Sequence, residues 1–172
     1  MATMAITTDT GETMRAAIRR RWGRPRDVVE LAEIAKPAPQ DDEVLVRVRA
    51  SSVNRSDYYS LGGVAVLMRP LIGGFLRPKD ERAGGDFAGI AEAVGRDVTD
   101  VRPGDEVYGV RTGAFAEYVS AKLAVARKPA NLSFEEAAAA PVAGLTALEA
   151  VLVRERNRFL EDALLGEGFP FP

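Results

Sequence analysis

Short apolar or alternating runs, separated by glycine and proline, occupy most of the first 120 residues. Trp22-Gly23 and Pro25 divide the first two runs and favour a hairpin there. The third run places Val44, Val46 and Val48 on one face, with Leu45 and two arginines on the other, which is the period of a half-buried strand. The pattern predicts strands at residues 14–20, 28–35, 43–50, 87–94, 106–110 and 114–120.

Helical signals begin after the third strand. Asn54 is a favourable N-cap, and residues 55–61 can form two turns before Gly62-Gly63 ends them. The following stretch is the least regular part of the chain, but its apolar content predicts a short amphipathic helix at 66–76.

The character of the sequence becomes helical from Ser133 onward. Ser133 and Glu136 have the spacing of a capping box, in which each side chain accepts a hydrogen bond from the other residue's amide. Pro141 interrupts this helix and suits the first turn of a second one. In that second helix three leucines recur on one face: Leu145, Leu148 and Leu152.

Composition narrows the class of protein. The chain has 172 residues, of which 47% are apolar and 28% charged, and these values fit one soluble globular domain. The net charge of -2 gives no reason to expect nucleic acid. Five arginines between Arg19 and Arg26 are read as a solvated part of the hairpin. Neither a signal peptide nor an uncharged stretch of membrane-spanning length is visible, so no membrane partner and a cytoplasmic location are expected.

The sequence contains no histidine and no cysteine. Zinc sites in proteins use thiolate and imidazole ligands, so a zinc centre is excluded on ligand chemistry. A histidine general base and a cysteine nucleophile are excluded for the same reason.

Four segments resemble one family in order and spacing: Gly104 to Gly109, Gly113 to Val119, Lys128 to Ser133, and Pro141 to Ala147. The chain resembles the GroES-like catalytic domain of the medium-chain dehydrogenase/reductases. The resemblance implies a mainly β (α+β) fold, a partly open β-barrel with a C-terminal helical segment. It divides the chain into a disordered segment at 1–13, the GroES-like domain at 14–153 and an atypical tail at 154–172.

Within this family the zinc-free, quinone oxidoreductase-like branch fits best. Asn54 stands where the zinc alcohol dehydrogenases have a ligand cysteine, and Gly85-Asp86-Phe87 replaces their Gly-His-Glu sequence. Asp86 itself is expected to be a turn or strand-start residue. The resemblance therefore implies an NADPH-dependent oxidoreductase without zinc, acting on a quinone or an enone-type substrate.

The resemblance also assigns candidate site residues. Asn54, Ser56 and Tyr58 would be catalytic, because an amide, a hydroxyl and a phenol supply hydrogen bonds and a proton without a metal. Arg55 would meet the cofactor pyrophosphate and Thr146 the nicotinamide carboxamide. Each of these residues also has a structural alternative. Asn54 would only cap a helix, Tyr58 or Tyr59 would be a core residue, and Thr146 would only pack against its neighbours. Asp57 is expected to be structural.

No strand, glycine-rich turn and helix with the spacing of a dinucleotide-binding unit is visible in the sequence. We therefore expect a truncated chain that is inactive alone and binds NADPH no more tightly than about millimolar. The apolar helix face would be covered by the tail or by a second copy in a homodimer. The alternative function is a non-catalytic GroES-like module that serves binding or assembly.

Overall fold

The computed structural model describes residues 11–63, 78, 80–122 and 124–165. The chain divides into two units, Met1–Val142 and Ala143–Pro172. All strands that the structure describes belong to the first unit. The predicted helix at 66–76 lies outside the described residues.

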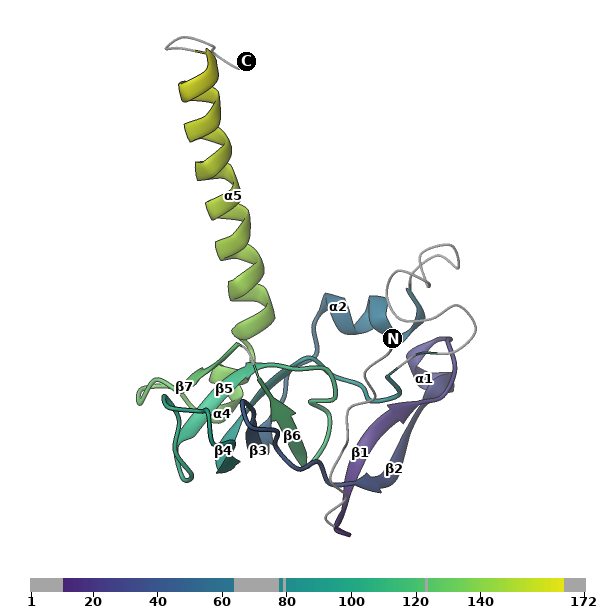
Figure 1. Ribbon diagram of the computed structural model, residues 1–172. Helices are drawn as coiled ribbons and strands as arrows, with labels where there is room; N and C mark the ends of the chain where they lie inside the picture. Colours follow the sequence, from purple (N-terminus) through teal and green to yellow (C-terminus); the bar gives the residue numbers. More distant parts are fainter. Residues whose placement is uncertain (1–10, 64–77, 79, 123, 166–172) are drawn as a thin grey trace, which may run out of the picture. The chain divides into compact units, whose positions relative to one another are not determined.

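The first two strands of the described residues form the predicted hairpin (Figure 1). Strands β1 (Thr13–Arg19) and β2 (Val29–Ala35) pair antiparallel, from Thr13 opposite Ala35 to Arg19 opposite Val29. A single helical turn, α1 (Pro25–Val28), forms part of the connection, with proline at its start. The hairpin is confirmed, and the turn residues chosen from the sequence lie between its strands.

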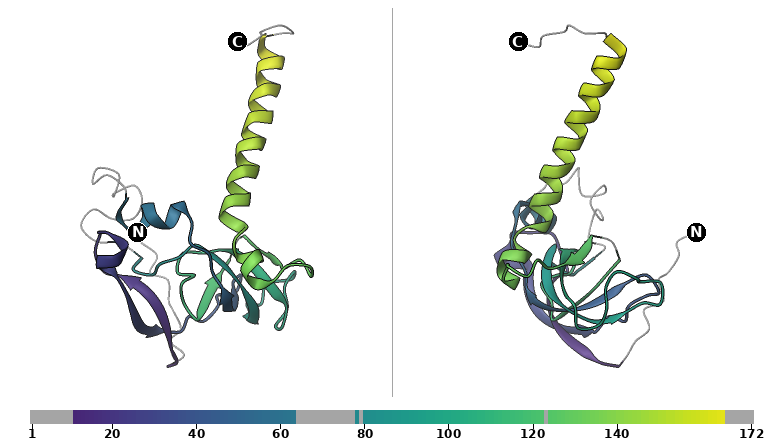
Figure 2. Two further views of the ribbon diagram at one scale, coloured as in Figure 1. Left: turned by 180° about the vertical axis from the view of Figure 1, so that it is seen from behind. Right: turned by 90° about the vertical axis from the view of Figure 1, so that its left-hand side faces the viewer.

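The second sheet has five strands in the order β6-β3-β4-β5-β7, and each neighbouring pair is antiparallel. Figure 2 shows the ribbons of these strands, coloured from blue through teal to green, from two further sides. Three strands confirm the predicted runs, whereas β7 was not predicted. The strands are β3 (Val44–Ala50), β4 (Asp86–Val94), β5 (Glu106–Val110), β6 (Tyr118–Ala121) and β7 (Val125–Arg127).

The hydrophobic core lies against one face of this sheet. Val44, Val46 and the completely buried Phe87 belong to it, as the alternation in β3 predicted. Leu45, on the other face, is also buried. Helix α4 (Phe134–Ala138) packs its alanines against Ala88 on β4 in a second, smaller cluster. The sheet is therefore covered on parts of both faces, which strict alternation does not anticipate.

The predicted strand at 114–120 is wrong in its first half, because β6 begins at Tyr118. Gly113 has a φ of 97° and turns the chain just before this segment. The Ala17 amide donates to the Phe115 carbonyl at 2.8 Å, and the Glu117 amide to the Arg15 carbonyl at 3.0 Å. Residues around Ala116 thus join β1 through an isolated bridge. The two sheets consequently remain open instead of closing into a barrel.

The predicted helix starts are confirmed. Asn54 precedes α2 (Arg55–Tyr58), which continues as a π-helical turn, η1 (Tyr59–Gly63), and this turn includes the two glycines that were expected to end the helix after Leu61. Ser133 and Glu136 form the expected capping box of α4. Both helices thus follow local sequence.

Helix α5 (Pro141–Leu165) starts at the predicted proline and runs without a break past the expected domain boundary at 153/154. Leu145, Leu148 and Leu152 on this helix are 48%, 55% and 58% exposed. Among the helices of the described ranges, none has both the length and the apolar character needed to cross a bilayer.

Candidate functional site

Asp86 is the centre of a polar network at the start of β4. The residue is 0% exposed. Its Oδ2 accepts hydrogen bonds from Ser52 Oγ at 3.0 Å and from Asn54 Nδ2 at 2.8 Å. Its Oδ1 accepts one from the Val142 amide at 2.9 Å, in the first turn of α5. A buried carboxylate requires such donors. Asp86 therefore holds together the start of β4, residues 52–54 and the first turn of α5.

Asn54 connects this network to helix α2. Its Oδ1 accepts hydrogen bonds from the Ser56 amide at 2.9 Å and from Ser56 Oγ at 2.5 Å. Its own amide donates to Asp57 Oδ2 at 2.8 Å, which completes a capping box. The capping interpretation of Asn54 therefore holds. The same side chain also contacts Asp86, so capping is not its only interaction.

Asp57 is the buried residue of α2. Burial raises the pKa of its carboxyl group, the hydrogen bond from the Asn54 amide lowers it in part, and the charge of Asp86 raises it further. The net result is a raised pKa, because the charged form is the one that burial disfavours. Its bond to the Asn54 amide agrees with the structural role expected for Asp57.

The other predicted site residues are exposed. Tyr58 and Tyr59 are 53% and 43% exposed and make an edge-to-face pair, so neither is a core residue. Arg55 Nε donates to Tyr59 Oη at 3.1 Å, and this bond raises the pKa of the Arg55 guanidinium. Thr146 is exposed on α5 in the second unit. The structure thus brings Asn54 and Ser56 together, with Arg55 and Tyr58 on the same short helix.

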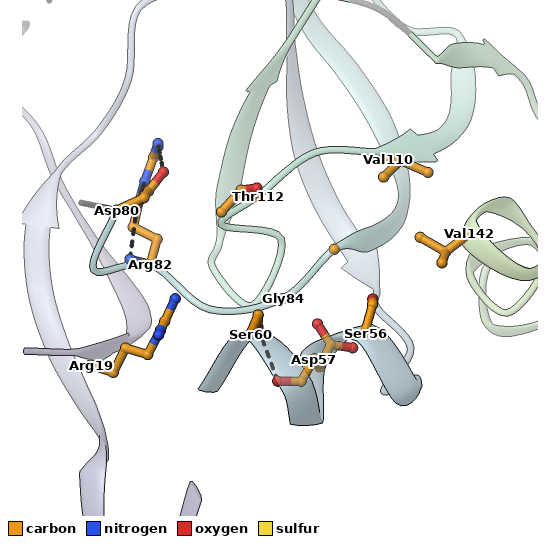
Figure 3. Close-up of a pocket in the computed structure, with 11 residues that line it drawn as sticks. Arg19, Ser56, Asp57, Ser60, Asp80, Arg82, Gly84, Val110, Thr112 and Val142 are labelled. Carbon is orange, nitrogen blue, oxygen red and sulfur yellow. Dashed lines mark hydrogen bonds and ion pairs between the residues drawn. The ribbon is translucent and has the colours of Figure 1, made fainter. Parts of the chain in front are cut away.

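A cavity of about 320 Å³ lies beside this network (Figure 3). Ser56 is the predicted site residue on its wall. Gly84, with a φ of 92°, brings the backbone close to the cavity, and a Cβ there would lie 2.5 Å from the Phe115 amide nitrogen. The lining residues are Arg19, Ser56, Asp57, Ser60, Asp80, Arg82, Gly84, Gly85, Val110, Thr112 and Val142.

Asp80 and Arg82 form a two-bond ion pair on the cavity wall. Arg82 donates to Asp80 from Nε at 3.1 Å and from Nη2 at 2.9 Å (Figure 3). Burial raises the pKa of Asp80, but the hydrogen bonds from Arg82 outweigh burial, so the pKa is lowered overall. The Asp80 carboxylate and the Arg82 guanidinium therefore neutralise each other at neutral pH.

Arg19 corrects an expectation from the sequence. It was grouped with solvated arginines, but it is only 7% exposed. Within the described part of the chain, its Nε and Nη1 have no hydrogen-bond partner. Its guanidinium lies over the Trp22 ring at 4.6 Å. No local signal distinguishes Arg19 from its neighbours, because burial depends on residues 80–85 packing beside β1.

Asp86, Asp80 and Arg82 were also not predicted as site residues. Asp86 did have a signal, since the resemblance drawn from the sequence set Gly85-Asp86-Phe87 against the Gly-His-Glu sequence of the zinc enzymes. No group of three or more metal-ligating side chains occurs in the residues that the structure describes.

Comparison with known proteins identifies the family. The sequence profile of the alcohol dehydrogenase GroES-like domain matches residues 40–130. Quinone oxidoreductase of Sus scrofa is 36% identical over 147 residues, covering 83% of this chain and 42% of that protein. The chloroplastic quinone-oxidoreductase homolog of Spinacia oleracea is 38% identical over 136 residues, covering 76% and 39%.

Solved structures agree. Quinone oxidoreductase from Coxiella burnetii superposes with a TM-score of 0.71 at 32% identity, covering 84% of this chain and 46% of that one. The Escherichia coli quinone oxidoreductase complexed with NADPH gives a TM-score of 0.65 at 28% identity, covering 78% and 39%.

The chain belongs to the alcohol dehydrogenase GroES-like domain family. More particularly, it is a quinone oxidoreductase-like member of the medium-chain dehydrogenase/reductase superfamily. It spans less than half the length of the quinone oxidoreductases that it matches.

Proposed function

We propose that this chain is the substrate-side domain of a zinc-independent, NADPH-dependent oxidoreductase that reduces a quinone or an activated alkene or carbonyl. One observation carries the proposal. Asn54 and Asp86 stand where the resembling zinc enzymes have metal ligands, and here they hydrogen-bond each other directly at 2.8 Å. A satisfied polar pair thus occupies the place of a metal, beside a cavity of about 320 Å³.

The residues next to this pair have the chemistry needed to orient and protonate a substrate oxygen. Ser56 lines the cavity, and its Oγ is held by Asn54 Oδ1, which Asp86 in turn positions. We propose that Ser56 relays a proton: its hydroxyl turns from Asn54 Oδ1 to the substrate oxygen, gives it the proton and takes up another from water. Tyr58, exposed on the same helix, supplies a phenol as a second donor to a carbonyl oxygen.

The described residues do not fit a whole dinucleotide. A Rossmann-type site binds the pyrophosphate with a parallel strand, a glycine-rich turn and a helix, whereas every strand pair that the structure describes is antiparallel. Bound NADPH supplies the hydride in such an enzyme. We propose that Arg55 and Thr146 offer this chain's contacts to the pyrophosphate and the nicotinamide, and that they alone give no tight binding.

A second candidate is a non-catalytic GroES-like binding or assembly module. The completeness of the Asp86 network favours it, because the three groups that donate to the carboxylate are already satisfied without a ligand. A module of this kind would keep the network for stability and would not bind quinone at the cavity.

Titration of the ¹⁵N-labelled chain distinguishes the two candidates. With tetramethyl-p-benzoquinone, we expect amide shifts at Ser56, Gly85 and Thr112 on the cavity wall, and several-fold weaker binding in Ser56→Ala. Ser133→Ala, which removes a hydroxyl from the cap of α4 instead, is the matched control. No shift at the cavity would favour the assembly module.

The same labelled chain tests the cofactor expectation. We expect NADPH to bind no more tightly than about 1 mM. A micromolar dissociation constant would contradict the proposal that this chain has no complete dinucleotide site.

A further inference from the structure

We propose that Arg19 makes the cavity selective for substrates that carry a carboxylate. The inference rests on the proposed function in taking the cavity as the substrate site. It adds a substrate class, namely quinones or enones with an acidic substituent. The proposal depends on one observation: the buried Arg19 guanidinium lines the cavity, and its Nε and Nη1 donate no hydrogen bond to any described residue.

The buried Arg19 guanidinium destabilises the fold unless a ligand accepts its hydrogen bonds. A buried donor without an acceptor destabilises a folded protein, and a charged donor does so more strongly. Arg19 is only 7% exposed, and two of its nitrogens have no acceptor among the described residues. Burial lowers the pKa of Arg19, partly offset by the charge of Asp80. An arginine nonetheless stays protonated at neutral pH, so a cation faces the cavity.

The other charged groups on the wall do not satisfy Arg19. The charge of Asp80 acts on Arg19, but both carboxylate oxygens of Asp80 accept hydrogen bonds from Arg82. Asp57 has a raised pKa and already accepts the Asn54 amide. Trp22 lies 4.6 Å from the Arg19 guanidinium as a cation-π partner, and Arg19 itself is one of the residues that line the cavity. Figure 3 shows the Arg19 side chain directed toward the space between the Asp80–Arg82 pair and Ser60.

The shape of the group and the size of the space favour a carboxylate on a small molecule. Guanidinium is planar, and its donors match the two oxygens of a carboxylate. A cavity of about 320 Å³ is at the small end of ligand sites, and suits a ring with one acidic substituent. A phosphate would satisfy the same donors, whether free or part of a cofactor, so the experiment separates the two anions.

The test uses sodium benzoate as the probe, benzamide as its neutral analogue and inorganic phosphate as the competing anion, each titrated into the ¹⁵N-labelled chain. We expect benzoate to shift the amides that line the cavity and benzamide to bind much more weakly. Arg19→Met should weaken benzoate binding by roughly tenfold or more, since a charge-assisted hydrogen bond is lost. Arg20→Met is the matched control, because Arg20 follows directly on the chain and its side chain is 62% exposed.

Thermal denaturation gives a second test with the same Arg19 variants. Benzoate should raise the melting temperature of the unmodified chain and leave that of Arg19→Met unchanged, because a ligand stabilises only the form that binds it. Arg19→Gln, which keeps a polar group of similar reach, should also lose the benzoate response, and serves if the methionine variant folds poorly.

Equal binding of benzoate by Arg19→Met and the unmodified chain would overturn the proposal, as would equal binding of benzamide, or no benzoate binding at all. Phosphate binding that exceeds benzoate binding and depends on Arg19 would also overturn it, in favour of a phosphate subsite. If benzoate binds through Arg19 but neither tetramethyl-p-benzoquinone nor a carboxyl-substituted benzoquinone shifts the cavity amides, the proposed reductase function fails while the carboxylate site stands.

Discussion

At the scale of single residues, the site depends on where one carboxylate is buried. The types and spacing of Asn54 and Asp57 are sufficient to predict a helix cap, because capping involves groups within three residues of each other. The role of Asp86 is different, since its donors come from Ser52, Asn54 and Val142, as many as 56 positions away. The residues next to Asp86 in the sequence do not predict that these distant donors meet at its carboxylate.

The substitution Asp86→Asn should destabilise the protein by roughly 2–3 kcal/mol. An asparagine keeps the shape but replaces one acceptor oxygen with an NH₂ group. Because each carboxylate oxygen of Asp86 accepts a hydrogen bond, one donor would then face another donor. Urea denaturation measures the change in the free energy of unfolding.

Asp97→Asn is the control, because Asp97 is an exposed carboxylate whose ion pair with Arg96 lies at the surface. We expect a change within about 0.5 kcal/mol for this control. Equal stabilities of the two variants would show that the buried network contributes little.

At the scale of secondary structure elements, local patterns predicted the elements that local interactions determine. The β1–β2 hairpin, the cap of α4 and the proline at the start of α5 follow from neighbouring residues. The segment before β6 was predicted wrongly, because its backbone bonds are shared between β1 and β3. Strand assignment there depends on partners far away in sequence, which an alternating pattern does not specify.

Two glycines allow the effect of close packing to be separated from that of backbone conformation. Gly84 and Gly104 have φ values of 92° and 95°, but only Gly84 lies against other atoms, since a Cβ added there would be 2.5 Å from the Phe115 amide nitrogen. Gly104→Ala should cost about 1 kcal/mol from its backbone conformation alone. Gly84→Ala should cost about 2 kcal/mol more, because the methyl group overlaps the Phe115 backbone.

Denaturation of both variants provides the measurement. Similar losses of stability would show that the Phe115 segment shifts readily, and that the cavity wall at Gly84 is less rigid than its packing indicates.

At the scale of the whole molecule, the exposed leucine face of α5 remains to be explained. Leu145, Leu148 and Leu152 are each about half exposed, which is unusual for three leucines on one helix face. The homodimer expected from the sequence is one way to cover them, and it stays a prediction. The related proteins are more than twice as long as the matched region, so the rest of such a chain offers a second candidate cover for this face.

If a second copy does cover this face, Leu148→Glu should weaken self-association by about tenfold or more, because a charge would enter an apolar contact. Ala150→Glu is the matched control, since it adds the same charge at an exposed position on the opposite side of the helix. Sedimentation equilibrium measures the association constant. A monomer at all concentrations, or equal effects of the two variants, would contradict the homodimer.

The sequence by itself determined the fold class, the helix caps and the hairpin, because these depend on residue types and on neighbours within a few positions. Only the tertiary structure decided that Asp86 gathers its donors and that Arg19 is buried at a cavity. Burial and unsatisfied charge are properties of packing between distant segments. An identical arginine one position further along the chain faces solvent, although the buried alternation of Met14, Ala16 and Ile18 would place Arg19 on the outer face.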